Sequence, residues 1–157
     1  MSEEDRIIIK ITTIPQKILT EVYNNPGITT SEIREKLKLS NSTLAKAISI
    51  LSDKYKLITK KISEDRKTYR LYPTLGFCDP NGRYAIIPSI LKKEDGVHVL
   101  GFTVYFFDKN VRCSSCEEFI SLLPEHEREA VRELLNYIKE IYEKLEKENI
   151  RKSSKVV

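Results

Sequence analysis

The fold is decided by one stretch of sequence, Pro26-Gly-Ile-Thr-Thr-Ser-Glu-Ile-Arg-Glu-Lys-Leu-Lys-Leu-Ser-Asn-Ser-Thr-Leu44. Within it, Thr29 stands three residues before Glu32, which is the spacing of a capping box at the start of a helix. Ile33 and Leu37 then repeat at a helical interval. The stretch predicts a short helix over residues 30–37, followed by a tight turn and the start of a second helix.

That second helix is predicted over residues 41–55, after a turn at Leu39-Ser40. Beyond it, residues 57–63 and the returning residues 68–72 read as two strands on either side of a charged turn, which predicts a β-hairpin. The apolar positions that define the helix recur at i, i+3, i+4 and i+7 and are Leu44, Ala47, Ile48 and Leu51.

Upstream, another helix is predicted between Thr13, a capping residue, and Asn25, which precedes Pro-Gly. Residues 6–11 are rich in isoleucine and too short for a helix, so they are expected to form a strand or an extended arm. Three short helices and a hairpin therefore share one core in the N-terminal half of the chain.

The rest of the chain changes pattern twice. Strands are predicted over residues 84–91 and 97–107, with Pro88 at a sheet edge or a bulge because it cannot donate a ladder hydrogen bond. A short helix is then expected over residues 117–123, and a long one from Glu125 to about Asn149 with a frayed tail after it.

The composition excludes several classes of protein. A chain of 157 residues, 40% hydrophobic and 32% charged, holds one core of ordinary size. Its apolar runs are too short to span a bilayer, so a soluble, cytoplasmic protein is expected. The net charge of +4 is concentrated in residues 41–72, where 8 basic side chains face 3 acidic ones. A polyanion is expected to bind there.

The order of helix, turn, helix, turn, helix and basic hairpin resembles the winged helix-turn-helix transcription regulators of the MarR type, archaeal in style. The resemblance covers residues 13–73 and rests on the stretch quoted above, on Leu51, on Leu57-Ile58 and on Asp65-Arg66 at the hairpin tip. It implies DNA binding. Residues 74–112 have no counterpart in that pattern, so no ligand residue of the family is carried over, and the effector is unknown.

The residues expected to bind DNA lie on two elements. A helix fits the major groove and its first residues reach base edges, so Asn41 is expected to contact adenine and Lys46 guanine or a phosphate. The hairpin would place cations on phosphates or in the minor groove. The candidates are Ser40, Asn41, Ser42, Thr43, Lys46 and Ser49 on the helix, and Lys60, Lys61, Arg66, Lys67 and Arg70 on the hairpin.

The cysteines form a second candidate site. Cys113 and Cys116 have the spacing of half a zinc site or of a redox pair, and a disulfide is also open. A complete zinc site would need Cys78 with His98, His126 or a carboxylate, or else a second subunit. Two ordinary thiols are the alternative.

The long C-terminal helix carries an apolar stripe with heptad spacing, typical of a coiled-coil seam between two subunits. The stripe can instead pack on the chain's own strand-rich segment. Its members are Val131, Leu134, Leu135, Ile138, Ile141, Tyr142 and Leu145.

Together these patterns predict an α+β protein with a winged helix over residues 1–73, a strand-rich segment over 74–112 and a helical dimerisation region over 113–157. The predicted function is a sequence-specific regulator that binds double-stranded DNA as a homodimer. The alternatives are a protein-binding adaptor in a basal transcription or replication complex, and a metal- or redox-responsive switch through Cys113 and Cys116. No catalytic motif is present, so an enzyme is not expected.

Overall fold

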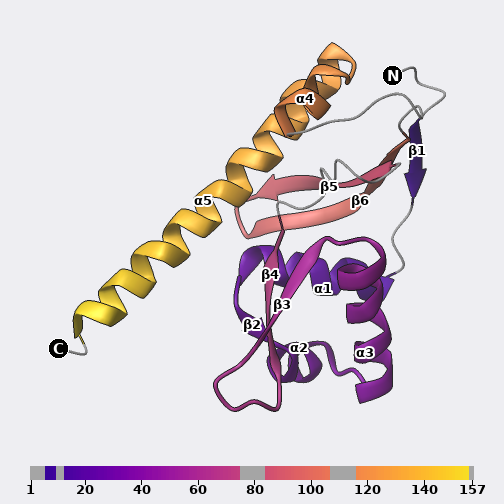
Figure 1. Ribbon diagram of the computed structural model, residues 1–157. Coiled ribbons are helices and arrows are strands. Elements are labelled where there is room, and N and C mark those ends of the chain that lie inside the picture. Colours follow the sequence, from indigo (N-terminus) through magenta and orange to yellow (C-terminus); the bar gives the residue numbers. More distant parts are fainter. Residues whose placement is uncertain (1–5, 10–12, 75–83, 107–115, 156–157) are drawn as a thin grey trace.

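The computed structural model describes residues 6–9, 13–74, 84–106 and 116–155 (Figure 1). It has the predicted α+β architecture, with a winged helix followed by a strand hairpin and a long helix. The winged helix comprises α1 (Thr13–Asn24), β2 (Ile28–Thr29), α2 (Thr30–Leu37), α3 (Asn41–Ser49), η2 (Ile50–Lys54), β3 (Ile58–Ile62) and β4 (Tyr69–Pro73). The other elements are β1 (Arg6–Ile9), β5 (Tyr84–Lys93), β6 (Gly96–Phe106), α4 (Cys116–Ser121) and α5 (Glu125–Lys155).

The winged helix forms as its local signals predict. The capping box is present, since the Thr29 hydroxyl accepts from the Glu32 amide and the Glu32 carboxylate accepts from the Thr29 amide. The strands β2, β4 and β3 form one antiparallel sheet in that order. The third helix ends earlier than predicted, because after Ser49 the chain widens into a π-helical turn in which the Tyr55 amide donates to the Ile50 carbonyl.

A second sheet has the strand order β1-β6-β5. The two strands predicted here are present and pair antiparallel, and β5 lies at an edge with a bulge between Ser89 and Ile90, next to Pro88 as expected. The N-terminal segment proves to be a strand that pairs antiparallel with β6, with Ile9 opposite Phe102.

Side chains of α1 take the place of a further strand beside the first half of β6. The Asn24 amide group donates to the Val97 carbonyl at 2.8 Å and accepts from the Val97 amide at 2.8 Å. One and two helical turns earlier, Thr20 accepts from the Val99 amide and Gln16 donates to the Val99 carbonyl at 2.7 Å. The winged helix is therefore joined to the second sheet by a polar row at i, i+4 and i+8.

Gly96, the first residue of β6, permits the Asn24 side chain of α1 to lie this close to the strand. Its φ of +129° is a conformation that L side chains rarely adopt, and a Cβ there would lie 2.5 Å from the Asn24 Oδ1 atom. A side chain at position 96 would displace Asn24 from the strand.

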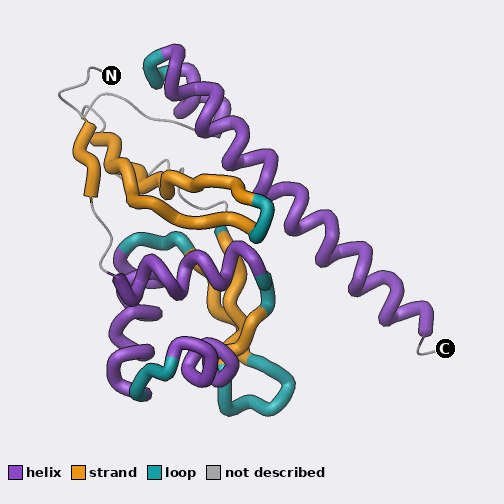
Figure 2. Tube along the Cα trace, turned by 180° about the vertical axis from the view of Figure 1, so that it is seen from behind, coloured by secondary structure: helices purple, strands orange, loops and turns teal. Residues whose placement is uncertain are grey.

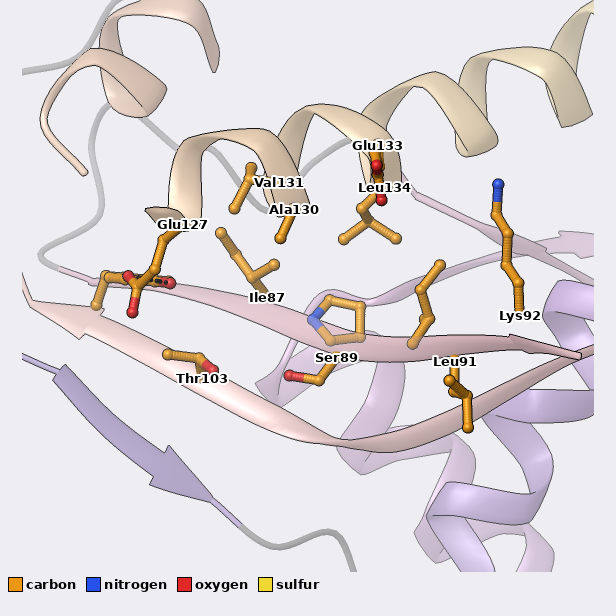
Figure 3. Close-up of a pocket in the computed structure, with 13 residues that line it drawn as sticks. Ile87, Ser89, Leu91, Lys92, Thr103, Glu127, Ala130, Val131, Glu133 and Leu134 are labelled. Atoms are coloured by element: carbon orange, nitrogen blue, oxygen red, sulfur yellow. Dashed lines mark hydrogen bonds between the residues drawn. The ribbon is translucent and has the colours of Figure 1, made fainter. Parts of the chain in front are cut away.

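The apolar stripe of the long helix packs on its own chain, which is the second of the two arrangements that its spacing allows. Val131, Leu134, Leu135, Ile138 and Ile141 are buried within the single chain, while Tyr142 and Leu145 are partly buried against the same core. Figure 3 shows Ala130, Val131 and Leu134 pointing from α5 toward Ile87 of β5. A cavity of about 550 Å³ remains between these two elements. The sequence left both arrangements open because a helix packed on a sheet shows the same spacing as one packed on another helix.

Two tyrosines fix α5 to the winged helix. The Tyr137 hydroxyl donates to the Tyr23 carbonyl at the end of α1, and the Tyr142 hydroxyl donates to the Pro73 carbonyl at the end of β4. The hairpin of β5 and β6 consequently lies between α1 and the first half of α5, as Figure 1 and, from behind, Figure 2 show. The helix continues to Lys155, beyond its predicted end near Asn149. None of the helices in the described residues is long and apolar enough to cross a membrane.

Candidate nucleic-acid interface

The start of α3 is shaped by hydroxyl groups. Ser40 is its N-cap, and its Oγ atom accepts from the Thr43 amide at 3.2 Å and donates to the Thr43 Oγ1 atom at 2.8 Å. These two predicted DNA-binding residues therefore bond to each other and hold the first turn in place.

The outward side of α3 is small and polar. Asn41, Ser42, Lys46 and Ser49 are exposed there, as the sequence predicts, and Ala45 lies among them. Sequence reasoning missed Ala45 because an alanine carries no polar signal, although its methyl group suits contact with the methyl of thymine. The side that faces away from the core thus has the size and chemistry of a recognition surface.

Arg34 of α2 reaches this surface and was also missed. Its Nη1 atom donates to the Asn41 Oδ1 atom at 2.7 Å. The helix-turn-helix geometry makes this contact possible, since Lys38 adopts a left-handed conformation with φ 54° and turns the chain back between the two helices. Seven positions apart in sequence, the two side chains meet at the N-terminal end of α3.

A carboxylate also lies at the interface. Asp53, in the π-helical turn, accepts from the Ser52 and Ser49 hydroxyls at 2.7 and 3.2 Å and lies 4.0 Å from the Lys60 Nζ atom. The Ser52 and Ser49 hydrogen bonds and the Lys60 charge lower the pKa of Asp53. Lys60 is consequently oriented toward the turn that follows α3.

The wing is the hairpin of β3 and β4 with the turn between them. Its cations lie on two different faces. Alternation along paired strands places Lys60 with the buried Leu71 on the face that covers the helices, and Lys61 and Arg70 on the opposite face. Arg70 bonds to the Glu64 carboxylate at 2.9 Å and to the Gly27 carbonyl at 2.9 Å. Of the three cations on the wing strands, Lys60 alone therefore lies on the helix side.

The wing also exposes two apolar side chains on its helix side. Ile62 and Tyr69 stand opposite each other in the strand pair and are 68% and 43% exposed. The Lys60 Nζ atom lies 5.5 Å from the centre of the Tyr69 ring, within reach of a cation–π contact. Their exposure could not be read from the sequence, where both look like ordinary strand residues.

The wing tip is held by Asp65. Its carboxylate accepts from the Ser63 hydroxyl and from the Lys67 and Thr68 amides, the latter two at 2.9 and 3.1 Å. Arg66, with φ 60°, and Lys67 are exposed at the tip, as predicted. The turn thus presents two cations at the end of a fixed support.

The tip should respond to acid in a defined range. The Ser63 hydroxyl and the Lys67 amide lower the pKa of Asp65 from 3.8 to about 2. Because the folded pKa is the lower one, these bonds stabilise the turn fully above about pH 4 and are lost as the pH falls toward 2. In a nuclear magnetic resonance titration the Lys67 amide should shift below pH 4, and Asp65→Asn should abolish the shift. An Asp65 pKa near 3.8 would contradict the assignment.

The predicted cysteine site falls largely outside the described residues. Cys78 and Cys113 are not among them, and Cys116 is seen only as the first residue of α4. His98 bonds to Asp95, with Nε2 3.1 Å from Oδ1, and the side chain of His126 lies outside the description. Within the described part of the chain, no group of three potential ligands could hold a metal ion.

Comparisons with known proteins point to the same region. Residues 11–54 match the family model described as winged helix-turn-helix DNA-binding. Among solved structures, the MarR protein from Peptoclostridium difficile DA00132 is similar, with 34% identity and a TM-score of 0.38 over 41% of this chain and 42% of that one. The similarity thus spans less than half of either chain. No curated protein matches the sequence.

Proposed function

We propose that this protein is a sequence-specific transcription regulator that binds double-stranded DNA as a homodimer. The observation that carries the proposal is the exposed polar side of the capped helix α3, which the contact between Lys60 of the wing and Asp53 of the following turn extends toward the hairpin. The helix would enter the major groove, and Arg66 and Lys67 would meet the flanking backbone or minor groove.

The homodimer follows from the size of the interface. A single module of this kind covers roughly 600–1,000 Å² on DNA, whereas tight specific binding generally uses more. Two copies on a two-fold site would place their recognition helices about 34 Å apart. Because the stripe on α5 is buried by its own chain, the two copies must meet through another surface or on the DNA itself.

Selection from a pool of random duplexes tests the proposal directly. We expect a palindrome to be enriched, with two half-sites whose centres lie about one helical turn apart. Sedimentation of the protein with the selected duplex should then give two copies per duplex. A pool that shows no enrichment after repeated rounds would contradict specific DNA binding.

Arg66 should contribute to affinity through the backbone. Arg66→Ala should weaken binding to all sequences alike and lower the slope of log K against log salt by about 1, because one fewer counterion is released. Fluorescence anisotropy over a salt series measures both effects. Lys139→Ala, which removes an exposed cation on α5, is the matched control and should leave the slope unchanged. Equal slopes for wild type and Arg66→Ala would exclude a tip contact.

One observation favours a second candidate, the winged-helix adaptor. The exposed pair of Ile62 and Tyr69 would suit a protein surface as well as a groove of DNA. The selection experiment separates the two functions, since an adaptor would enrich no duplex.

A further inference from the structure

Arg34 and Asn41 form a pair at the end of α3 whose chemistry is fixed by one contact. A guanidinium group has only donors, so the atom of the Asn41 carboxamide that meets it must be the oxygen. The distance of 2.7 Å between Nη1 and Oδ1 is that of a charge-assisted hydrogen bond. The Asn41 amide is thereby prevented from turning over.

The remaining polar atom of Asn41 is its Nδ2, which carries two donors. Asn41 is the first residue of α3 and is exposed, at the place from which a recognition helix reaches base edges. The free N–H groups of Arg34 add further donors beside it. Together the two side chains offer the DNA a surface of donors.

The bases differ in how well they fit such a surface. In the major groove guanine shows two acceptors, N7 and O6, while cytosine shows a donor. Adenine shows one acceptor and one donor, and a two-bond contact with asparagine would need the second lone pair of the Asn41 oxygen, next to the Arg34 guanidinium group that already bonds to the first. Thymine shows one acceptor beside a methyl group.

We propose that Arg34 is a positioning residue that turns Asn41 into a donor and so sets a preference for guanine at the base pair under the start of α3. This inference rests on the proposed function and replaces the expected contact between Asn41 and adenine. Arg34 would set this preference through Asn41. Its positive charge would in addition attract the phosphates of the DNA, whatever the sequence.

The test uses the full-length protein and the duplex obtained by selection. Asn41→Ala identifies the base pair that Asn41 reads, as the position where the preference is lost. Duplexes with each of the four base pairs at that position then measure the preference of each variant by anisotropy. In the wild type we expect guanine to bind about tenfold more tightly than adenine.

Arg34→Met keeps the length of the side chain and removes its donors. We expect it to reduce the preference for guanine to about threefold or less at that position and no other, and to add nothing in combination with Asn41→Ala. Arg34→Gln, which can offer either a donor or an acceptor to Asn41, should lower the preference likewise and serves where Arg34→Met does not fold. Circular dichroism establishes the folding of each variant.

Lys36→Met is the matched control. Lys36 lies on the same helix and is paired with Glu21 of α1 at 2.7 Å, so its loss removes the same charge without removing the bond to Asn41. We expect its preference for guanine to be unchanged, and any loss of affinity from the removed charge to be equal for all four duplexes.

Two outcomes would overturn the inference while leaving the proposed function intact. In the first, Arg34→Met weakens all four duplexes equally and keeps the wild-type preference, as a phosphate contact alone would. In the second, the wild type prefers adenine at the position that Asn41 reads. A protein that binds no duplex better than random DNA would overturn both the inference and the proposed function.

Discussion

Replacing Ile138 by alanine should lower the free energy of unfolding by about 2–5 kcal/mol, the range for a large aliphatic side chain lost from a packed core. Ile138 is 0% exposed in the single chain, in the middle of the contact between α5 and the rest of the molecule. Its truncation leaves a cavity rather than a free surface. Urea unfolding followed by circular dichroism measures the change.

The same experiment distinguishes the two roles of the stripe. Leu145→Ala, where α5 leaves the core and the side chain is partly exposed, is the control and should cost much less. Ile138→Asp should unfold the protein, because a buried unpaired charge is far more costly than a cavity. If Ile138→Asp instead stayed folded and only shifted sedimentation from dimer to monomer, the stripe would be a subunit seam after all.

Phe102→Ala should have a comparable or larger effect, about 3–5 kcal/mol. Phe102 of β6 is 0% exposed and packs edge-on against Tyr55 of the winged helix, with ring centres 5.4 Å apart. Removing the ring leaves a cavity where the sheet of β1, β6 and β5 packs against the winged helix. Because the winged helix and the second sheet share this contact, the urea midpoint should fall by the same amount for the amide signals of α3 and of β6.

Leu100→Ala is the control for this prediction, since Leu100 lies two residues away on the same strand and is 58% exposed. We expect it to leave the midpoint nearly unchanged. If Phe102→Ala destabilised β6 while α3 kept the wild-type midpoint, the winged helix would be an independent folding unit.

The winged helix could be predicted because its signals are local. The capping box of Thr29 and Glu32 and the 3.6-residue stripe of α3 each depend on residues within one or two turns. The hairpin was equally readable from its β-branched strands and charged turn. Such features require no knowledge of distant parts of the chain.

The arrangement beyond residue 73 could be predicted only in part. The elements themselves are periodic and were found, but the pairing of β1 with β6 and the contact of Asn24 with Val97 join residues 73 or more positions apart. No spacing in the sequence specifies them. The partner of α5 was undecided for the same reason, since its stripe fits a sheet and a helix alike.

The candidate site shows the same division. Exposure of Asn41, Lys46 and Arg66 followed from their elements. The faces of the wing did not, because they depend on the register that puts Lys61 opposite Arg70. The bond from Arg34 to Asn41 depends on the angle between two helices, which the turn at Lys38 sets.

The polar row on α1 also bears on association with foreign chains. A strand edge with free amide and carbonyl groups is a template on which another β-strand can add, and soluble proteins cover or charge such edges. Along β6, the groups of Val97 and Val99 that would serve as that template are filled by Asn24, Thr20 and Gln16. A helix offers no ladder on its far side. Along this stretch of β6, α1 of the winged helix therefore occupies the place where a strand of another chain could otherwise pair.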